Sequence, residues 1–183
     1  MHQLIIFGPP GVGKGTQSEM IARNLNLFHL STGEILRKEI NEGSELGIAA
    51  KHIVEKGCLV PDEIMIGIVA KALKENLIGK DGFILDGFPR TNEQAKELDT
   101  IFEKMNFTEI KILYLIVNED ELVSRLMKRG RVDDTEETIR KRLKIYIDST
   151  SPVLEYYKDK RKVTEIDGVG EIDEIYSKIL NIL

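Results

Sequence analysis

The chain has 183 residues, a formal net charge of −5 and a composition that is 42% hydrophobic and 31% charged. These values are typical of one globular domain, and the acidic balance argues against a nucleic-acid surface, which needs a broad basic face. The first residues lack a basic segment and a long apolar run, so we expect no signal peptide, no membrane span and a cytoplasmic location. One cysteine, Cys58, and three scattered histidines predict neither an internal disulfide nor a zinc site.

Short apolar runs alternate along the chain with helical patterns. Strands are predicted at 4–7, 82–86, 110–117 and 162–167, and a further short strand at 27–30. These runs show little polar alternation, which is typical of parallel strands covered on both faces. Between them, apolar residues recur at spacings of three and four, which indicates amphipathic helices. The predicted fold class is therefore α/β, with a five-stranded parallel sheet between two layers of helices.

The stretch IIFGPPGVGKGTQ, residues 5–17, follows the first strand and precedes a helix. Its glycines allow a tight turn whose backbone N–H groups, with the helix N-terminus, point at one place and attract an anion. Lys14 adds a mobile positive charge to this cradle. The common phosphate-binding loop reads G-x-x-x-x-G-K-[ST], whereas here Gly15 follows the lysine and the hydroxyl comes at Thr16. We interpret the stretch as a phosphate cradle; a glycine-rich turn without a ligand is the alternative.

Two segments interrupt the alternation of strands and helices. Residues 31–61 form a helical excursion with glycines at its joints, which indicates a small inserted subdomain. Residues 128–138, KRGRVDDTEET, form a cationic turn between two helices. Within it, Asp134 and Glu137 have the spacing of an N-terminal capping box.

Polar residues also follow the strand at 82–86. Asp86 stands at its carboxyl end, where ligands of open α/β sheets bind; a cap on the following turn is the structural alternative. In the sequence GFPR after it, Gly87 permits close approach of a ligand and Arg90 supplies a positive charge beside it. We expect Thr91 to cap the helix that carries Gln94.

The motifs GPPGVGKGT, STGEILR, LVPDE, LDGFPRT..Q and GRVDDTEETIRKRL occur in order through essentially the whole chain and together resemble the adenylate kinase family. In that family a glycine after the lysine is normal, and Mg²⁺ is reached largely through water held by a strand-end aspartate, here Asp86. The resemblance implies one P-loop kinase domain, 1–183, with an NMP-binding insertion at 31–61 and a short lid at 128–134. Its core would comprise residues 1–30, 62–127 and 135–183.

The implied reaction is reversible, Mg²⁺-dependent, in-line phosphoryl transfer from ATP to AMP, giving two ADP. Such transfer needs positioning and charge neutralisation, for which guanidinium groups suit phosphate oxygens well. Catalytic roles are implied for Lys14, Asp86, Arg90, Arg125, Arg129, Arg131 and Arg142, but not for Arg140. ATP would be held by Gly11, Val12, Gly13, Lys14, Gly15, Thr16, Arg125, Arg129, Gly168, Val169 and Gly170. AMP would be held by Thr32, Gly33, Leu36, Arg37, Leu59, Val60, Gly87, Arg90, Gln94, Arg131 and Arg142.

No general base is required, because a nucleoside monophosphate has a second phosphate pKa of about 6 and is already mostly ionised. Thr32 and Gln94 resemble the adenylate type, whereas UMP/CMP kinases typically have alanine at the first position and an asparagine-rich sequence after the arginine. A UMP/CMP kinase, a kinase that uses GTP, or a nucleotide-gated binding protein of another class are the alternatives. We expect a monomer that binds neither nucleic acid nor membranes.

The chain departs from the family at the lid, where short-lid members usually carry a few more residues between KRG and RVDD. Because a lid excludes water from the transferring phosphoryl group, this departure predicts looser donor binding or measurable ATP hydrolysis without acceptor. We expect Asp133 to steer Arg129 or Arg131, and Asp134 to cap the following helix.

Overall fold

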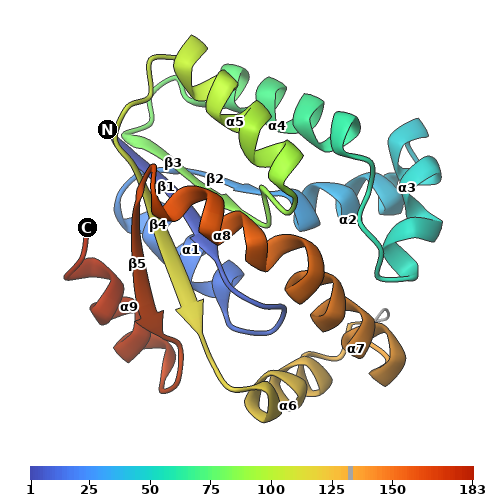
Figure 1. The fold of residues 1–183 in the computed structure, drawn as a ribbon. Helices are drawn as coiled ribbons and strands as arrows, with labels where there is room; N and C mark the ends of the chain where they lie inside the picture. Colours follow the sequence, from blue (N-terminus) through green and yellow to red (C-terminus); the bar gives the residue numbers. More distant parts are fainter. Residues whose placement is uncertain (132–133) are drawn as a thin grey trace.

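The computed structural model describes residues 1–131 and 134–183, and within them the strands form one parallel sheet of five in the order β2-β3-β1-β4-β5 (Figure 1). The strands are β1 (His2–Phe7), β2 (Phe28–Ser31), β3 (Gly82–Asp86), β4 (Ile110–Ile116) and β5 (Lys162–Asp167). The predicted α/β class with five parallel strands is confirmed. The strand expected at 27–30 begins one residue later.

The helices cover both faces of this sheet (Figure 1). They are α1 (Lys14–Asn24), α2 (Thr32–Glu42), α3 (Glu45–Glu55), α4 (Asp62–Asn76), α5 (Asn92–Lys104), α6 (Glu119–Arg129), α7 (Glu136–Ile145), α8 (Ser151–Lys158) and α9 (Ile172–Leu180), with a π-helical turn, η1 (Tyr146–Thr150), between α7 and α8. The helical excursion at 31–61 is thus confirmed as α2 and α3.

The core lies on both sides of the sheet because successive strand side chains point to opposite faces. On β1, Ile5 and Phe7 pack with residues of α4, α5 and α8, whereas Leu4 and Ile6 pack with residues of α1, α6, α7 and α9. Each of these four side chains is at most 3% exposed. Two apolar faces explain why the strand sequences show little polar alternation.

The parallel arrangement places every strand's carboxyl end at one edge of the sheet. The loop after β1, the residues after β3 and the start of α2 therefore meet there, and α6 follows β4 at the same edge (Figure 1). At Gly57, an added Cβ would lie 3.0 Å from Thr138 Cγ2, so the end of the 31–61 excursion lies against α7. None of the described helices combines the length and apolar character needed to cross a bilayer.

Candidate active site

A cavity of about 790 Å³ opens at this edge of the sheet. Its size falls in the upper range of small-molecule sites. The structure brings together around it nearly all of the residues that the sequence singled out: Gly11, Val12, Gly13, Lys14, Gly15, Thr16, Thr32, Gly33, Leu36, Arg37, Leu59, Val60, Asp86, Gly87, Arg90, Gln94, Arg125, Arg129, Arg131, Arg142 and Gly170. Gly168 and Val169 are not among its lining residues, and Val169 is exposed.

The loop between β1 and α1 forms one wall of the cavity. Gly13 precedes α1 in a left-handed conformation, with φ 103°, and no side chain caps the first turn of the helix. At Gly8, an added Cβ would lie 2.7 Å from the Leu115 carbonyl oxygen, so only glycine lets this loop pass β4. The uncapped helix N-terminus that faces the cavity is a site for an anion.

Lys14 extends into this loop and is held by backbone oxygens. Its Nζ donates to the carbonyl oxygens of Gly8 at 2.7 Å and Pro9 at 3.0 Å. Burial is the main cause that lowers the pKa of Lys14 to about 8; Asp86 acts in the opposite direction, and Arg90 and Arg129 contribute to the lowering. Burial therefore disfavours the positive charge of Lys14, and a bound polyanion would favour it.

Arg90 lines the same cavity as Lys14. Its Nε donates to the Gly87 carbonyl oxygen at 2.7 Å, and an added Cβ at Gly87 would lie 2.9 Å from the Arg90 guanidinium. Burial lowers the pKa of Arg90, and the charges of Arg142 and Arg37 act in the same direction while Asp86 opposes them. Gly87 therefore makes room for the Arg90 side chain, and several arginines crowd around one carboxylate.

One half of the cavity is lined by residues of α2, α5 and the segment after β3. Thr32 is 1% exposed, and its hydroxyl donates to the Gly87 carbonyl oxygen at 2.9 Å. The Arg37 guanidinium lies over Gly33, where an added Cβ would be 3.1 Å from it. Thr91 caps α5 as expected, because its hydroxyl oxygen accepts from the Gln94 backbone N–H.

Arg125 connects two segments of the opposite half. Its Nη1 donates to the carbonyl oxygens of Val12 at 3.3 Å and Gly168 at 3.1 Å, and its Nε pairs with Glu121 at 2.7 Å. The side chain therefore joins the β1–α1 loop to the loop that follows β5.

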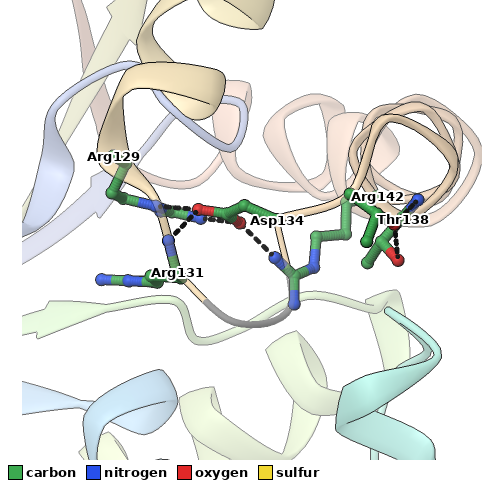
Figure 2. Close-up of polar contacts among 6 residues, drawn as sticks. Arg129, Arg131, Asp134, Thr138 and Arg142 are labelled. Atoms are coloured by element: carbon green, nitrogen blue, oxygen red, sulfur yellow. Dashed lines mark hydrogen bonds and ion pairs between the residues drawn. The ribbon is translucent and has the colours of Figure 1, made fainter.

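Asp134 is not the cap of α7, and this prediction was wrong. The N-cap is Thr135, whose hydroxyl oxygen accepts from the Thr138 N–H. Figure 2 shows the Asp134 carboxylate between Arg129 and Arg142, at 2.7 Å from Arg129 Nη2 and 3.0 Å from Arg142 Nη1. A threonine one residue later takes the cap, so the carboxylate is left to bind the arginines. The expected role of Asp133 lies outside the described residues.

Sequence reasoning missed several supporting residues. Thr150, in η1, donates its hydroxyl to the Arg90 carbonyl oxygen at 3.0 Å. Asp62 accepts from Thr91 and Gln94. Asp62 lies in the motif LVPDE, whose local sequence does not indicate a partner for its carboxylate. No local pattern around Thr150 connects it to Arg90, 60 positions away.

Comparisons with known proteins agree with this geometry. A sequence model of the family described as adenylate kinase matches residues 6–162. An adenylate kinase of Bacteroides thetaiotaomicron is 45% identical over 183 residues, covering 98% of this chain and 96% of that protein. One from Chloroherpeton thalassium is 40% identical over 212 aligned positions, covering 99% of this chain and 97% of that protein. One from Nocardioides sp. is 42% identical over 186 positions, covering 99% of this chain and 96% of that protein. The chain belongs to the adenylate kinase family, whose members are nucleotide-binding phosphotransferases.

Proposed function

We propose that the cavity holds ATP and AMP end to end and that a phosphoryl group passes directly between them, giving two ADP. The observation that carries this proposal is the convergence of Lys14 and six arginines on one cavity beside Asp86: Arg37, Arg90, Arg125, Arg129, Arg131 and Arg142. Two bound nucleotides would bring several phosphates together, and their charge offsets the repulsion among these cations. The described residues of a single chain supply all of these cations, so the proposed transfer requires no second subunit.

ATP occupies the half of the cavity formed by the β1–α1 loop, α6 and the loop after β5. Its phosphates lie at the N-terminus of α1, where the residues from Gly11 to Thr16 offer backbone N–H groups and Lys14 its ammonium. Arg125 already links Val12 to Gly168, which supports a donor base bound along the segment from Gly168 to Gly170.

AMP occupies the half formed by α2, α5 and the residues after β3. Arg37 and Arg90 bind its phosphate, and Thr32, Leu36 and Gln94 face its base together with the backbone around Leu59 and Val60. The Gly87 carbonyl oxygen accepts from both Thr32 and Arg90, so the base and phosphate ends of this half share one anchor.

The oxygen-bearing side chains beside the phosphate loop fit a magnesium ion that binds together with ATP. Within the described residues there is no cluster of three or more potential metal-ligating side chains, but Asp86 Oδ2 lies 3.6 Å from the Cβ position of Gly15, beside the phosphate loop. Mg²⁺ commonly binds through one carboxylate, water and substrate phosphates. Asp86, through water, and the Thr16 hydroxyl would hold it, and when bound it neutralises charge on the transferring phosphoryl group.

The protein supplies positioning rather than proton transfer. The AMP phosphate is ionised at neutral pH, so its oxygen attacks without a base. Arg90, Arg129, Arg131 and Arg142 stabilise the charge that spreads over the phosphoryl oxygens in the transition state. Residues 31–61 close over AMP, whereas the short segment 128–134 covers ATP less completely, so water is excluded only in part.

A steady-state assay of ADP formation tests the proposal. With Mg²⁺, ATP and AMP we expect turnover in the ordinary range for such kinases, and much lower rates when UMP or CMP replaces AMP or when GTP replaces ATP. Arg90→Met should abolish most turnover, whereas Arg140→Ala, at an exposed pair with Glu136, should retain it. Preferred turnover of UMP or CMP would overturn the assignment of AMP.

A further inference from the structure

Gln94 is held by both ends of its side-chain amide. Its Nε2 donates to Asp62 Oδ1 at 2.7 Å, and its Oε1 accepts from the Arg90 backbone N–H at 2.7 Å. The residue is 2% exposed and lines the acceptor half of the cavity. The other carboxylate oxygen of Asp62 accepts from the Thr91 hydroxyl at 2.9 Å.

These partners fix the orientation of the Gln94 side-chain amide. An amide turned by 180° would place its oxygen against the Asp62 carboxylate and its NH₂ group against the Arg90 N–H, so both contacts would be lost. The orientation therefore follows from the chemistry of the partners, since an ionised carboxylate can only accept and a backbone N–H can only donate. In this buried position, the loss of two such hydrogen bonds is costly.

The two hydrogen bonds use one of the two Nε2 hydrogens and one of the two Oε1 lone pairs. One Nε2 hydrogen and one Oε1 lone pair remain available to a ligand, and their positions are fixed by the orientation of the amide. Adenine offers the complementary pair, because its ring N1 accepts and its exocyclic amine donates. Hypoxanthine and guanine offer the reverse pair, a ring N–H and a carbonyl oxygen, which would suit only the turned amide.

We propose that Asp62 is a positioning residue that sets base selectivity at the acceptor site by holding the Gln94 amide in the orientation that accepts an amino-purine and rejects an oxo-purine. This inference rests on the proposed function, because it takes the base near Gln94 to be that of the acceptor. Asp62 acts through Gln94 and does not itself touch the nucleotide.

The position of Asp62 in the fold supports this role. It is the first residue of α4 and directly follows the 31–61 segment, while Thr91 and Gln94 begin α5. The carboxylate thus joins the starts of two helices on the acceptor side of the cavity. A purely structural link would support the helices without any effect on which base is accepted, so base selectivity is the readout that separates the two roles.

The test compares Asp62→Ala and Asp62→Ser with the wild-type protein in steady-state assays with AMP and with IMP at saturating Mg-ATP. Alanine removes the acceptor, and serine can either accept or donate, so in both variants only the Arg90 backbone N–H still favours the original orientation of the Gln94 amide. We expect the ratio of kcat/KM for AMP to that for IMP to fall at least tenfold, mainly through KM for AMP, with KM for ATP within twofold of wild type. Asp62→Asn, whose amide can either accept from or donate to Gln94, should lower the ratio in the same direction.

Glu63→Ala is the matched control, because it removes an exposed carboxylate from the same first turn of α4. It should leave the AMP/IMP ratio unchanged, and far-ultraviolet circular dichroism and thermal unfolding should show that every variant is folded. An AMP/IMP ratio within twofold of wild type in Asp62→Ala and Asp62→Ser would overturn the inference, whether or not KM for AMP rises. A wild-type protein that does not phosphorylate AMP at all would instead overturn the proposed function.

Discussion

Asp134 and Arg129 form a bidentate pair: Arg129 Nε lies 2.8 Å from Oδ2 and Nη2 lies 2.7 Å from Oδ1. The same carboxylate accepts from Arg142 and from the Arg131 backbone N–H, and its side chain is fully buried. One carboxylate thus orients two guanidinium groups that line the cavity from different helices, α6 and α7 (Figure 2).

Asp134→Asn should therefore weaken the donor side of the site. We expect kcat/KM for ATP to fall about tenfold, because Arg129 and Arg142 lose their common anchor. We expect the free energy of unfolding to fall by about 1–2 kcal/mol, less than for a fully buried pair because Arg129 is 30% exposed. Glu136→Gln, which breaks an exposed pair, is the control and should change stability by less than about 0.5 kcal/mol. Equal effects of the two substitutions would contradict the role given to Asp134.

The contribution of Asp134 should also depend on pH. Burial acts to raise the pKa of this carboxyl, but the hydrogen bonds and charges of Arg129, Arg131 and Arg142 outweigh it, so its pKa lies below 3.8. A depressed pKa contributes stability that is fully present above the unfolded pKa and is lost as pH falls through the folded one. Urea denaturation should show the stability gap between wild type and Asp134→Asn narrowing below about pH 4. If the stability difference between wild type and Asp134→Asn became larger below pH 4, the lowered pKa of Asp134 would be refuted.

Arg90→Met should separate activity from stability. We expect kcat to fall by about 10³-fold, since a preorganised charge is removed from the transferring group. The thermal midpoint of the empty protein should hardly fall, because the substitution relieves repulsion with Lys14, Arg142 and Arg37. Differential scanning calorimetry without nucleotide checks this point, with Arg140→Met as the control. A fall of the midpoint by more than about 8 °C would show that Arg90 is chiefly structural.

Nucleotide binding should be accompanied by proton uptake at Lys14. With a pKa of about 8, this group is largely neutral at pH 8.5, and bound phosphates would restore its charge. We expect an uptake of roughly 0.7 proton per ATP at pH 8.5 and roughly 0.1 at pH 7. Isothermal titration calorimetry in buffers of different ionisation enthalpy measures it. Lys14→Arg stays charged at both pH values, so its uptake should vanish; an uptake that persists would assign it to another group.

The brevity of the 128–134 turn should allow water to reach the donor. We expect ATP hydrolysis in the absence of AMP to be faster than in a longer relative, or KM for ATP to be higher. The Chloroherpeton thalassium protein is a suitable reference because its alignment extends over 212 positions, more than the 183 residues of this chain. Equal hydrolysis rates and equal KM values in the two proteins would contradict the prediction.

The sheet and the phosphate loop were predictable because their signals are local. Strands such as Ile110–Ile116 are apolar on both faces, and the glycines before Lys14 occupy backbone conformations that other residues avoid. The roles of the arginines were inferred from the resemblance to the family. No local pattern distinguishes Arg142, which lines the cavity, from Arg140, which is two residues away and exposed.

The missed or misassigned residues depend on tertiary contacts. Asp134 and Thr135 are both good N-caps, so the sequence alone cannot decide between them. The choice depends on where Arg129 and Arg142 lie once α6 and α7 are packed. Asp62 and Gln94 are likewise 32 residues apart and meet only because α4 and α5 start side by side.

The most direct measurement is the binding of two adenosines joined by five phosphates, which would occupy the donor and acceptor halves together. Isothermal titration should give one equivalent per chain, an affinity well above that of ATP or AMP alone, and a loss of at least 100-fold in Arg90→Met. Binding no tighter than that of ATP, or an affinity unaffected by Arg90→Met, would contradict the claim that these cations hold two nucleotides end to end.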